Sequence, residues 1–404
     1  MERMGIAPQR ADPLSYLGDQ IADWKAAGTY QRLRILEGPN AAESRFDGHD
    51  VVNLASNNYL GLTTHPKLIE AAVEATRKYG AGSGAVRTIS GTMDLHMELE
   101  RRIARFKNVE ACVVFQSGFA ANAGTVAAVL TPDDYVISDE LNHASIIDGC
   151  RLSRAKIRVF PHKDHWAAGK ILAELEAVPG RKILITDGVF SMDGDIAPLA
   201  ELVEQAERFG AIMMVDDAHS SGVLGRNGRG TIDHFNLHGR VDIQVGTLSK
   251  AIGVLGGYVC GTRNLIEFLY QRARPFLFST SHPPAVTAAC LAAFDILENE
   301  PERIEKLWEN TRYFKAGLTD AGFDTGMSET PITPVIVGDA AKAYQFSREL
   351  FDEGVLATGI AFPTVAKDKA RVRTIVSAAH TTGQLDRALD VFKRVAGRME
   401  ILSQ

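Results

Sequence analysis

The feature that most constrains the fold is a regular alternation of short apolar runs with helical stretches, beginning at residue 111. The apolar runs predict strands over residues 111–115, 135–138, 157–160, 182–186, 212–216, 241–245 and 256–260. Helices are predicted between the first five of them, near residues 118–130, 144–154, 166–177 and 198–209. Continuously apolar strands separated by helices are typical of a parallel sheet covered on both faces. Such sheets bind ligands at the carboxyl ends of their strands.

After Pro283 the pattern changes to two long helical runs, shorter strands and a last helix. The helices are predicted over residues 284–300, 301–321 and 383–402, and the strands over 332–337, 355–358 and 372–375. We interpret this part as a smaller α+β domain, which the amphipathic helix at residues 14–27 is expected to join. The chain then divides into an N-terminal helix and short-strand segment (1–59), a large α/β domain (60–283) and a small C-terminal domain (284–404).

Composition argues against several classes of partner and site. The net charge of -6, with no basic block, disfavours nucleic acid as a partner. The four cysteines lie far apart without a C-x-x-C pair, which disfavours a zinc site or a disulfide framework and favours a reducing compartment. No run of 18 apolar residues exists, and residues 1–20 lack the pattern of a signal peptide. We therefore expect no membrane partner and a cytoplasmic location.

Lys250 is the first candidate for chemistry, in the segment Gly246-Thr247-Leu248-Ser249-Lys250-Ala251 between two predicted strands. A lysine at a strand end is placed to point into a cleft. Burial or a neighbouring positive charge lowers the pKa of such an amine, and the neutral amine can form a Schiff base with an aldehyde. A lone lysine is more often a solvated loop residue, so this interpretation depends on motifs elsewhere.

Acidic and imidazole side chains follow the predicted strand 212–216, in Val215-Asp216-Asp217-Ala218-His219. A carboxylate at a buried strand end can hold a nearby positive charge, such as a protonated pyridine nitrogen. A metal site is less favoured, because no histidine pair or further acidic cluster has ligand spacing. A loop that is merely hydrogen-bonded within itself stays open.

The segment Ser117-Gly118-Phe119 leads from a predicted strand into a helix. The helix N-terminus could bind a phosphate, or Ser117 could simply cap the helix. The chain lacks G-x-x-x-x-G-K-[ST], and its glycine-rich loop at 80–88 does not fit G-x-G-x-x-G after a strand. Nucleoside triphosphates and dinucleotides are therefore disfavoured as ligands.

Other polar residues near predicted strand ends have two interpretations each. His143 could stack on a flat heteroaromatic ring or begin a helix. Asp187 and Ser191 could face a ligand or form a turn, and the hydroxyls of 279–281 could bind phosphate or cap a helix. Arg371 and Arg373 point to the same face of a strand, where an arginine could grip a carboxylate or remain solvated.

Taken together, these segments resemble the α-oxoamine synthase family of enzymes that use pyridoxal 5'-phosphate (PLP). The matching motifs are S-N-N-Y-L-G-L (56–62), G-A-G-S-G-A-V-R (80–87), S-G-F (117–119), N-H-A-S (142–145), D-G-V-F-S-M-D-G-D (187–195), V-D-D-A-H (215–219), T-L-S-K (247–250), F-S-T-S (278–281) and R-V-R-T (371–374). They occur in family order and span most of the chain. The resemblance implies the type I fold of PLP-dependent transferases: a large domain whose mostly parallel seven-stranded sheet lies between helices, and a smaller α+β domain. It also implies a homodimer with shared active sites.

The resemblance assigns expected roles to individual residues. Lys250 would carry PLP as a Schiff base, Asp216 would pair with the pyridine N–H, His219 would contact the phenolic oxygen, and His143 would stack on the ring. The phosphate would be held by Ser117, Gly118, Phe119, Thr247 and, from the partner subunit, Thr280. Asn57 and Arg373 would bind the substrate carboxylate, and Ser191 would contact the cofactor and the reacting group.

Members of this family join an amino acid to an acyl-CoA and release CoA. Residues 374–381 and 56–59 most resemble the branch that condenses glycine with acetyl-CoA to 2-amino-3-ketobutyrate, which is the first expectation (glycine C-acetyltransferase). The alternatives are 8-amino-7-oxononanoate synthesis from L-alanine and pimeloyl-CoA with decarboxylation, in biotin biosynthesis, or a broad-specificity member. Val254 and Leu255 depart from many glycine-specific members, which leaves the acyl length open.

Overall fold

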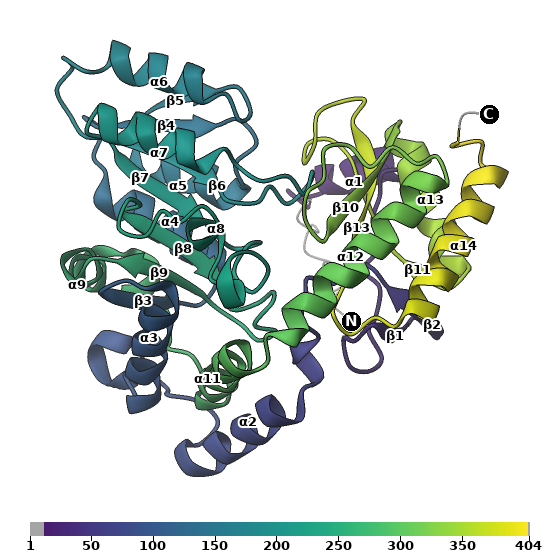
Figure 1. Ribbon diagram of the computed structural model, residues 1–404, viewed down its shortest axis with the longest axis horizontal. Helices are drawn as coiled ribbons and strands as arrows, with labels where there is room; N and C mark the ends of the chain where they lie inside the picture. Colours follow the sequence, from purple (N-terminus) through teal and green to yellow (C-terminus); the bar gives the residue numbers. More distant parts are fainter. Residues whose placement is uncertain (1–11, 403–404) are drawn as a thin grey trace, which may run out of the picture.

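The computed structural model describes residues 12–402 and has two lobes, shown in Figure 1. A seven-stranded sheet in the order β3-β9-β8-β7-β6-β4-β5 forms the centre of the larger lobe. Its strands are β3 (Ala111–Phe115), β4 (Tyr135–Asp139), β5 (Lys156–Phe160), β6 (Lys182–Asp187), β7 (Ile212–Asp216), β8 (Ile243–Thr247) and β9 (Gly257–Gly261). Only β9 runs antiparallel to its neighbours, β3 and β8. The predicted mostly parallel sheet is confirmed.

Helices cover both faces of this sheet because successive apolar side chains of its strands point to opposite sides. In β6, Ile183 and Ile185 pack beneath α4 (Gly118–Val129), α5 (Ala144–Ser153) and α9 (Arg263–Arg272). Leu184 packs on the opposite face beneath α6 (His165–Glu174) and α7 (Leu199–Arg208). The short helices α8 (Thr231–His234) and α10 (Arg274–Leu277) complete these layers.

The smaller lobe contains two three-stranded sheets and its own apolar core. One sheet has the order β10-β13-β12, from β10 (Ile332–Gly338), β13 (Ala370–Ile375) and β12 (Thr358–Ile360). The other joins β1 (Glu43–Phe46) and β2 (His49–Asn53) to β11 (Val355–Leu356). Helices α12 (Glu302–Asp320), α13 (Ala340–Asp352) and α14 (Thr382–Arg398) supply the rest of the core. The prediction of one strand over 355–358 was wrong, because the chain changes sheets at Ala357.

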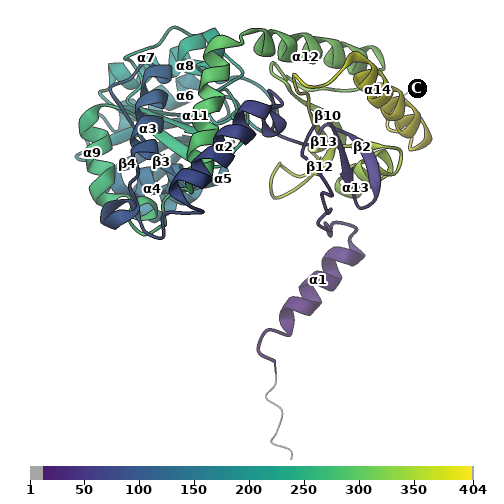
Figure 2. The ribbon, with the colours of Figure 1, turned by 90° about the horizontal axis from the view of Figure 1, so that it is seen from below.

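The N-terminal helix α1 (Tyr16–Ala26) has no buried residue and projects away from both lobes, as Figure 2 shows. The expectation that it joins the smaller domain was therefore wrong; β1 and β2 provide that connection instead. Helix α11 (Pro284–Asn299) packs against α2 (Pro66–Tyr79) and α3 (Asp94–Lys107) of the larger lobe. We propose that the domain boundary lies between α11 and α12, near Glu300, rather than at residue 283.

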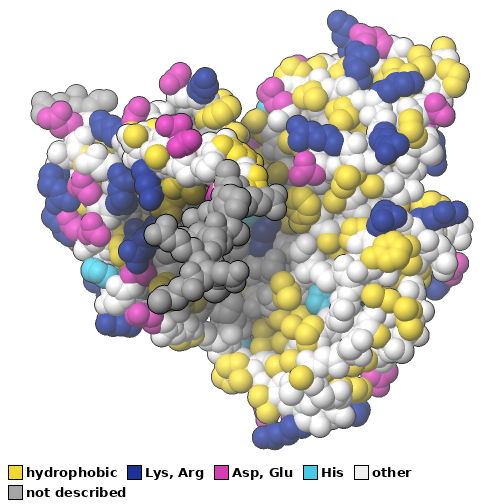
Figure 3. Space-filling view, turned by 180° about the vertical axis from the view of Figure 1, so that it is seen from behind, with side chains coloured by type: hydrophobic (Ala, Val, Ile, Leu, Met, Phe, Trp, Pro, Cys, Tyr) yellow, Lys and Arg dark blue, Asp and Glu magenta, His cyan; other side chains and the backbone are white. Residues whose placement is uncertain are grey.

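Basic and acidic side chains are interspersed over the face of the molecule seen in Figure 3, and the surface is hollowed between the two lobes. Within residues 12–402, no helix combines the length and apolar character that crossing a bilayer requires.

Candidate active site

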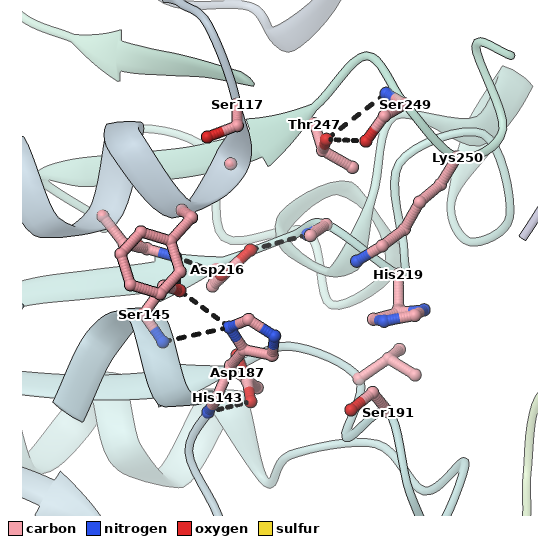
Figure 4. Close-up of a pocket in the computed structure, with 15 residues that line it drawn as sticks. Ser117, His143, Ser145, Asp187, Ser191, Asp216, His219, Thr247, Ser249 and Lys250 are labelled. Carbon is pink, nitrogen blue, oxygen red and sulfur yellow. Dashed lines mark hydrogen bonds between the residues drawn. The ribbon is translucent and has the colours of Figure 1, made fainter. Parts of the chain in front are cut away.

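A cavity of about 190 Å³ lies at the carboxyl ends of the parallel strands. Strands β6, β7 and β8 end at this cavity and deliver Asp187, Asp216 and Thr247, which Figure 4 shows around it. Parallel strands end at the same edge of a sheet, so residues far apart in sequence meet there. Nine of the predicted site residues line the cavity: Ser117, Gly118, Phe119, His143, Ser191, Asp216, His219, Thr247 and Lys250.

One side of the cavity is formed by the N-terminus of α4. Ser117 caps this helix, because its Oγ accepts a hydrogen bond of 3.0 Å from the backbone N–H of Ala120. Strand β9, which pairs with β3, approaches the same turn so closely that a Cβ at Gly257 would lie 2.3 Å from the carbonyl oxygen of Ser117. Free N–H groups and the helix dipole make this turn favourable for an anion such as a phosphate. Glycine at position 257 is required for that approach.

The floor of the cavity is the carboxylate of Asp216, which is held by one hydrogen bond to each oxygen. Its Oδ1 accepts from the backbone N–H of Ala218 at 2.8 Å, and its Oδ2 accepts from Nδ2 of Asn122 at 2.6 Å. Asn122 comes from α4, 94 residues away in the sequence. Both bonds orient the buried carboxylate, which is therefore preorganised to hold a positive charge.

Lys250 enters the cavity from the loop after β8, and Figure 4 shows its amine directed toward the centre. Burial lowers the pKa of this amine from 10.5 to about 8, although the charges of Asp216 and Asp187 oppose the shift. A substantial fraction of the amine is thus neutral near neutral pH. The neutral form is the one that reacts with an aldehyde.

His143 is positioned by two neighbours that frame its ring. Its backbone N–H donates to Oδ2 of Asp187 at 2.9 Å, and its Nδ1 lies 2.7 Å from the hydroxyl of Ser145. Burial lowers the pKa of His143. Burial and the nearby charge of Asp216 raise the pKa of Asp187 well above its usual range. A neutral imidazole beside a cavity suits stacking on a flat ring.

His219 completes this edge of the cavity and is buried against Tyr59. Its Nδ1 lies 2.8 Å from the Tyr59 hydroxyl. Burial and the charges of Lys250 and Arg373 lower the pKa of His219 well below its ordinary value, so its ring is neutral. Burial raises the pKa of Tyr59, so its hydroxyl keeps its proton.

Three predicted residues do not line this cavity. Asn57 and Arg373 lie toward the smaller lobe, where Arg373 donates to the carbonyl oxygen of Ser191 at 3.0 Å. The Oδ1 of Asn57 is buried, and no hydrogen-bond partner for it occurs in the described part of the chain. Thr280 is exposed and forms an isolated bridge with Val86.

Several residues that line the cavity were not among those predicted from the sequence. They are Asn122, Ser145, Val189, Ala218 and Ser249, and Asp187 was left open as a turn former. The amide side chain of Asn122 in the mostly apolar helix 118–129 was the one signal that could have marked it. Ser145, Ala218 and Ser249 stand inside motifs already quoted, but spacing alone does not show which residue of a motif faces a cavity.

The residues around the cavity fit PLP. The helix N-terminus with the Gly257 approach offers a place for the phosphate, the oriented carboxylate of Asp216 suits a protonated ring nitrogen, and the amine of Lys250 suits the aldehyde. Among residues 12–402, no three His, Cys, Asp or Glu side chains come together as a metal site.

Comparisons with known proteins agree with this architecture. The family model "Aminotransferase class I and II" matches residues 49–392. The chain is 60% identical over 387 residues to an 8-amino-7-oxononanoate synthase of Symbiobacterium thermophilum, covering 96% of this chain and 99% of that protein. It is 57% identical to the enzyme of that name from Thermoanaerobacter pseudethanolicus, covering 96% of this chain and 98% of that protein.

Solved structures of PLP-containing enzymes have the same fold as this chain. A serine palmitoyltransferase from S. paucimobilis with bound PLP–myriocin superimposes with a TM-score of 0.92 and 32% identity, covering 97% of this chain and 100% of that chain. The fold and the ordered motifs of this chain agree with these matches. The chain belongs to the aminotransferase class I and II family and, within it, to the PLP-dependent α-oxoamine synthases.

Proposed function

We propose that this protein is an 8-amino-7-oxononanoate synthase, which joins L-alanine to pimeloyl-CoA and releases CoA and carbon dioxide. The observation that carries the proposal is the identity of 53% to 60% with several enzymes of that name. It favours the alternative over the glycine and acetyl-CoA pair expected first. The resemblance of residues 374–381 and 56–59 to the glycine branch was therefore misleading, because the two branches share most of the quoted motifs and identity over the whole chain separates them better.

We infer that PLP is held by contacts at opposite ends of the cavity. The phosphate would lie at Ser117, Gly118 and Phe119 with Thr247, whose Oγ1 donates to the carbonyl oxygen of Gly256 at 2.8 Å. Asp216 would face the ring nitrogen, and His143 would lie against the ring. When bound, PLP supplies an electron-accepting ring conjugated to the substrate amine.

The residues of the chain would handle the proton and the carboxylate of the substrate. The amine of Lys250, whose lowered pKa leaves part of it neutral, would be the base that removes the proton from the α-carbon of alanine and later returns a proton. Arg373 and Asn57 would bind the substrate carboxylate. This role is supported by the hydrogen bond from Arg373 to the carbonyl oxygen of Ser191, which lines the cavity, and by the buried side chain of Asn57, whose Oδ1 has no partner within residues 12–402. Burial lowers the pKa of Arg373. An arginine guanidinium nevertheless stays protonated in proteins, so we expect its charge to persist.

We also propose a homodimer that completes the site. Thr280 is exposed and lies off the cavity of its own chain, which suits a contribution to the phosphate site of a second copy. The four cysteines are free and buried, which agrees with the expected cytoplasmic location.

A panel that measures CoA release tests the substrate pair. Purified holoenzyme is assayed with alanine, glycine or serine against pimeloyl-, acetyl- and palmitoyl-CoA, and Lys250→Ala serves as the inactive control. We expect the highest kcat/KM for alanine with pimeloyl-CoA. A higher kcat/KM for glycine with acetyl-CoA, or for serine with palmitoyl-CoA, would overturn the proposal while leaving the family assignment intact.

A further inference from the structure

The hydrogen bond between His219 and Tyr59 joins a cavity residue to a motif that lies 160 residues earlier in the chain. Tyr59 is only 1% exposed and His219 only 8%. Their rings meet edge to face, with centroids 6.2 Å apart and planes at 85°. Tyr59 does not line the cavity, so any effect it has on bound groups passes through His219.

The Tyr59 side chain is held in place by the hydrogen bonds of its own backbone groups and by core packing around its ring. The N–H of Tyr59 donates to the carbonyl oxygen of Asn57 at 2.8 Å, and its own carbonyl oxygen accepts from the N–H of Ala378 at 2.7 Å. The ring lies in the core cluster that also contains Leu60 and Leu248. A side chain held by packing and by both backbone groups cannot turn its hydroxyl toward another partner.

The direction of the proton in this bond follows from what each group could otherwise do. If Nδ1 of His219 carried the hydrogen, the Tyr59 oxygen would accept it, and the tyrosine proton would need a second acceptor. The Tyr59 hydroxyl has no other hydrogen-bond partner among residues 12–402. A buried donor without an acceptor is unfavourable, so the hydroxyl donates and Nδ1 accepts.

A neutral imidazole whose Nδ1 accepts must carry its hydrogen on Nε2. The ring is kept neutral because it is buried and because the groups that face it are cations or another imidazole: Lys250, Arg373 and His143. Nε2 makes no hydrogen bond within the described part of the chain, and His219 lines the cavity. The free N–H is therefore available to an acceptor bound there.

We propose that Tyr59 is a positioning residue that holds His219 as the neutral Nε2–H tautomer, so that the imidazole presents a hydrogen-bond donor to the cavity. The inference about the tautomer does not rest on the proposed function, but the inference about the cofactor does. An Nε2–H group would donate to a negatively charged oxygen of bound PLP and stabilise it. In the other tautomer the lone pair of Nε2 would face that oxygen and repel it.

The tautomer is measured in the apoprotein by NMR of protein labelled with ¹⁵N-histidine, with the His219 signal assigned from its absence in His219→Gln. We expect Nδ1 to give the signal of an unprotonated nitrogen and Nε2 that of a protonated one. In Tyr59→Phe, which keeps the ring and removes only the hydroxyl, this preference should fall by about tenfold or more. Because the first measurement uses the unaltered chain, it decides the matter even if the variant folds poorly.

Tyr258→Phe is the matched control. Tyr258 is also 1% exposed, lies in the same core cluster, and its hydroxyl makes one side-chain hydrogen bond, 2.8 Å from Oγ of Ser221. It does not line the cavity, so its loss should leave the His219 signals unchanged. An Nδ1–H tautomer in the unaltered protein, or equal changes in both variants, would overturn the proposal.

A second readout uses the holoprotein without substrates. The pH midpoint of the visible absorption band of bound PLP should shift in Tyr59→Phe and stay in place in Tyr258→Phe. An unshifted midpoint in Tyr59→Phe would refute the link to the cofactor. Neither measurement involves an acyl-CoA, so failure of the CoA-release panel and failure of this inference are separate outcomes.

Discussion

The lowered pKa of Lys250 leads to a quantitative prediction for the apoprotein. With a pKa of about 8, about one amine in ten is neutral at pH 7, whereas a pKa of 10.5 would leave about one in three thousand. At pH 7, Lys250 should therefore react with a small amine-reactive compound about 300-fold faster than it would if its pKa were 10.5. The reaction rate should rise tenfold per pH unit below pH 8 and level off above it.

Removing the charge of Asp216 tests this explanation of the pKa of Lys250. That charge is the largest influence that opposes burial, so it keeps the pKa of Lys250 higher than burial alone would. Asp216→Asn removes this charge at nearly constant volume, so the midpoint should move below pH 8 by about one unit or more. At pH 7 the variant should then label faster than the unaltered protein.

Competitive labelling with a limiting amount of acetic anhydride, followed by mass spectrometry of the digest, measures the midpoint. The exposed Lys170 in the same digest serves as the internal reference for reagent decay. Lys250→Arg removes the labelled peptide and confirms its assignment. A midpoint near 10.5 in the unaltered apoprotein, or an upward shift in Asp216→Asn, would refute the reasoning.

Three further predictions follow from other contacts. In the unaltered protein the Nζ of Lys107 lies 2.7 Å from the buried carboxylate of Asp217. Lys107→Met should lower the free energy of unfolding by about 3–5 kcal/mol in urea denaturation, because it leaves that carboxylate without its cation. Adding Asp217→Asn should recover most of the loss. His162 has a pKa raised to about 9 by hydrogen bonds to Asp139 and Asp195, despite partial burial, so its stabilisation is complete below pH 6.5 and lost as the pH rises through 9. His162→Gln should remove that part of the pH dependence of the free energy of unfolding, about 1–2 kcal/mol after allowing for contact with water. Urea denaturation across this pH range measures it, and an unchanged slope would contradict the prediction. Gly257→Ala should weaken PLP binding by about tenfold or more in an absorbance titration, because its Cβ would meet the Ser117 turn at 2.3 Å, whereas Gly383→Ala has open space and should bind PLP normally.

Local patterns were sufficient for most of the central sheet. Continuous apolar runs such as Lys182 to Thr186 form strands because both of their faces are buried, and the residue types alone state this. The same reasoning failed at residues 355–358, where a run short enough to be one strand serves two sheets. It also failed for α1, because an amphipathic pattern shows that a helix can be covered without showing what covers it.

The amino-acid sequence by itself determined the alternation of strands and helices, the edge of the sheet where polar residues gather, and the family to which nine ordered motifs belong. Only the tertiary structure decided which side chains touch: Asn122 orients Asp216, Gly257 permits the turn at Ser117, and Tyr59 meets His219 across 160 residues. The physical reason is the range of the information. Periodicity and residue type report what a segment prefers locally, whereas a hydrogen bond between distant segments depends on how the strands are ordered and how closely their loops approach.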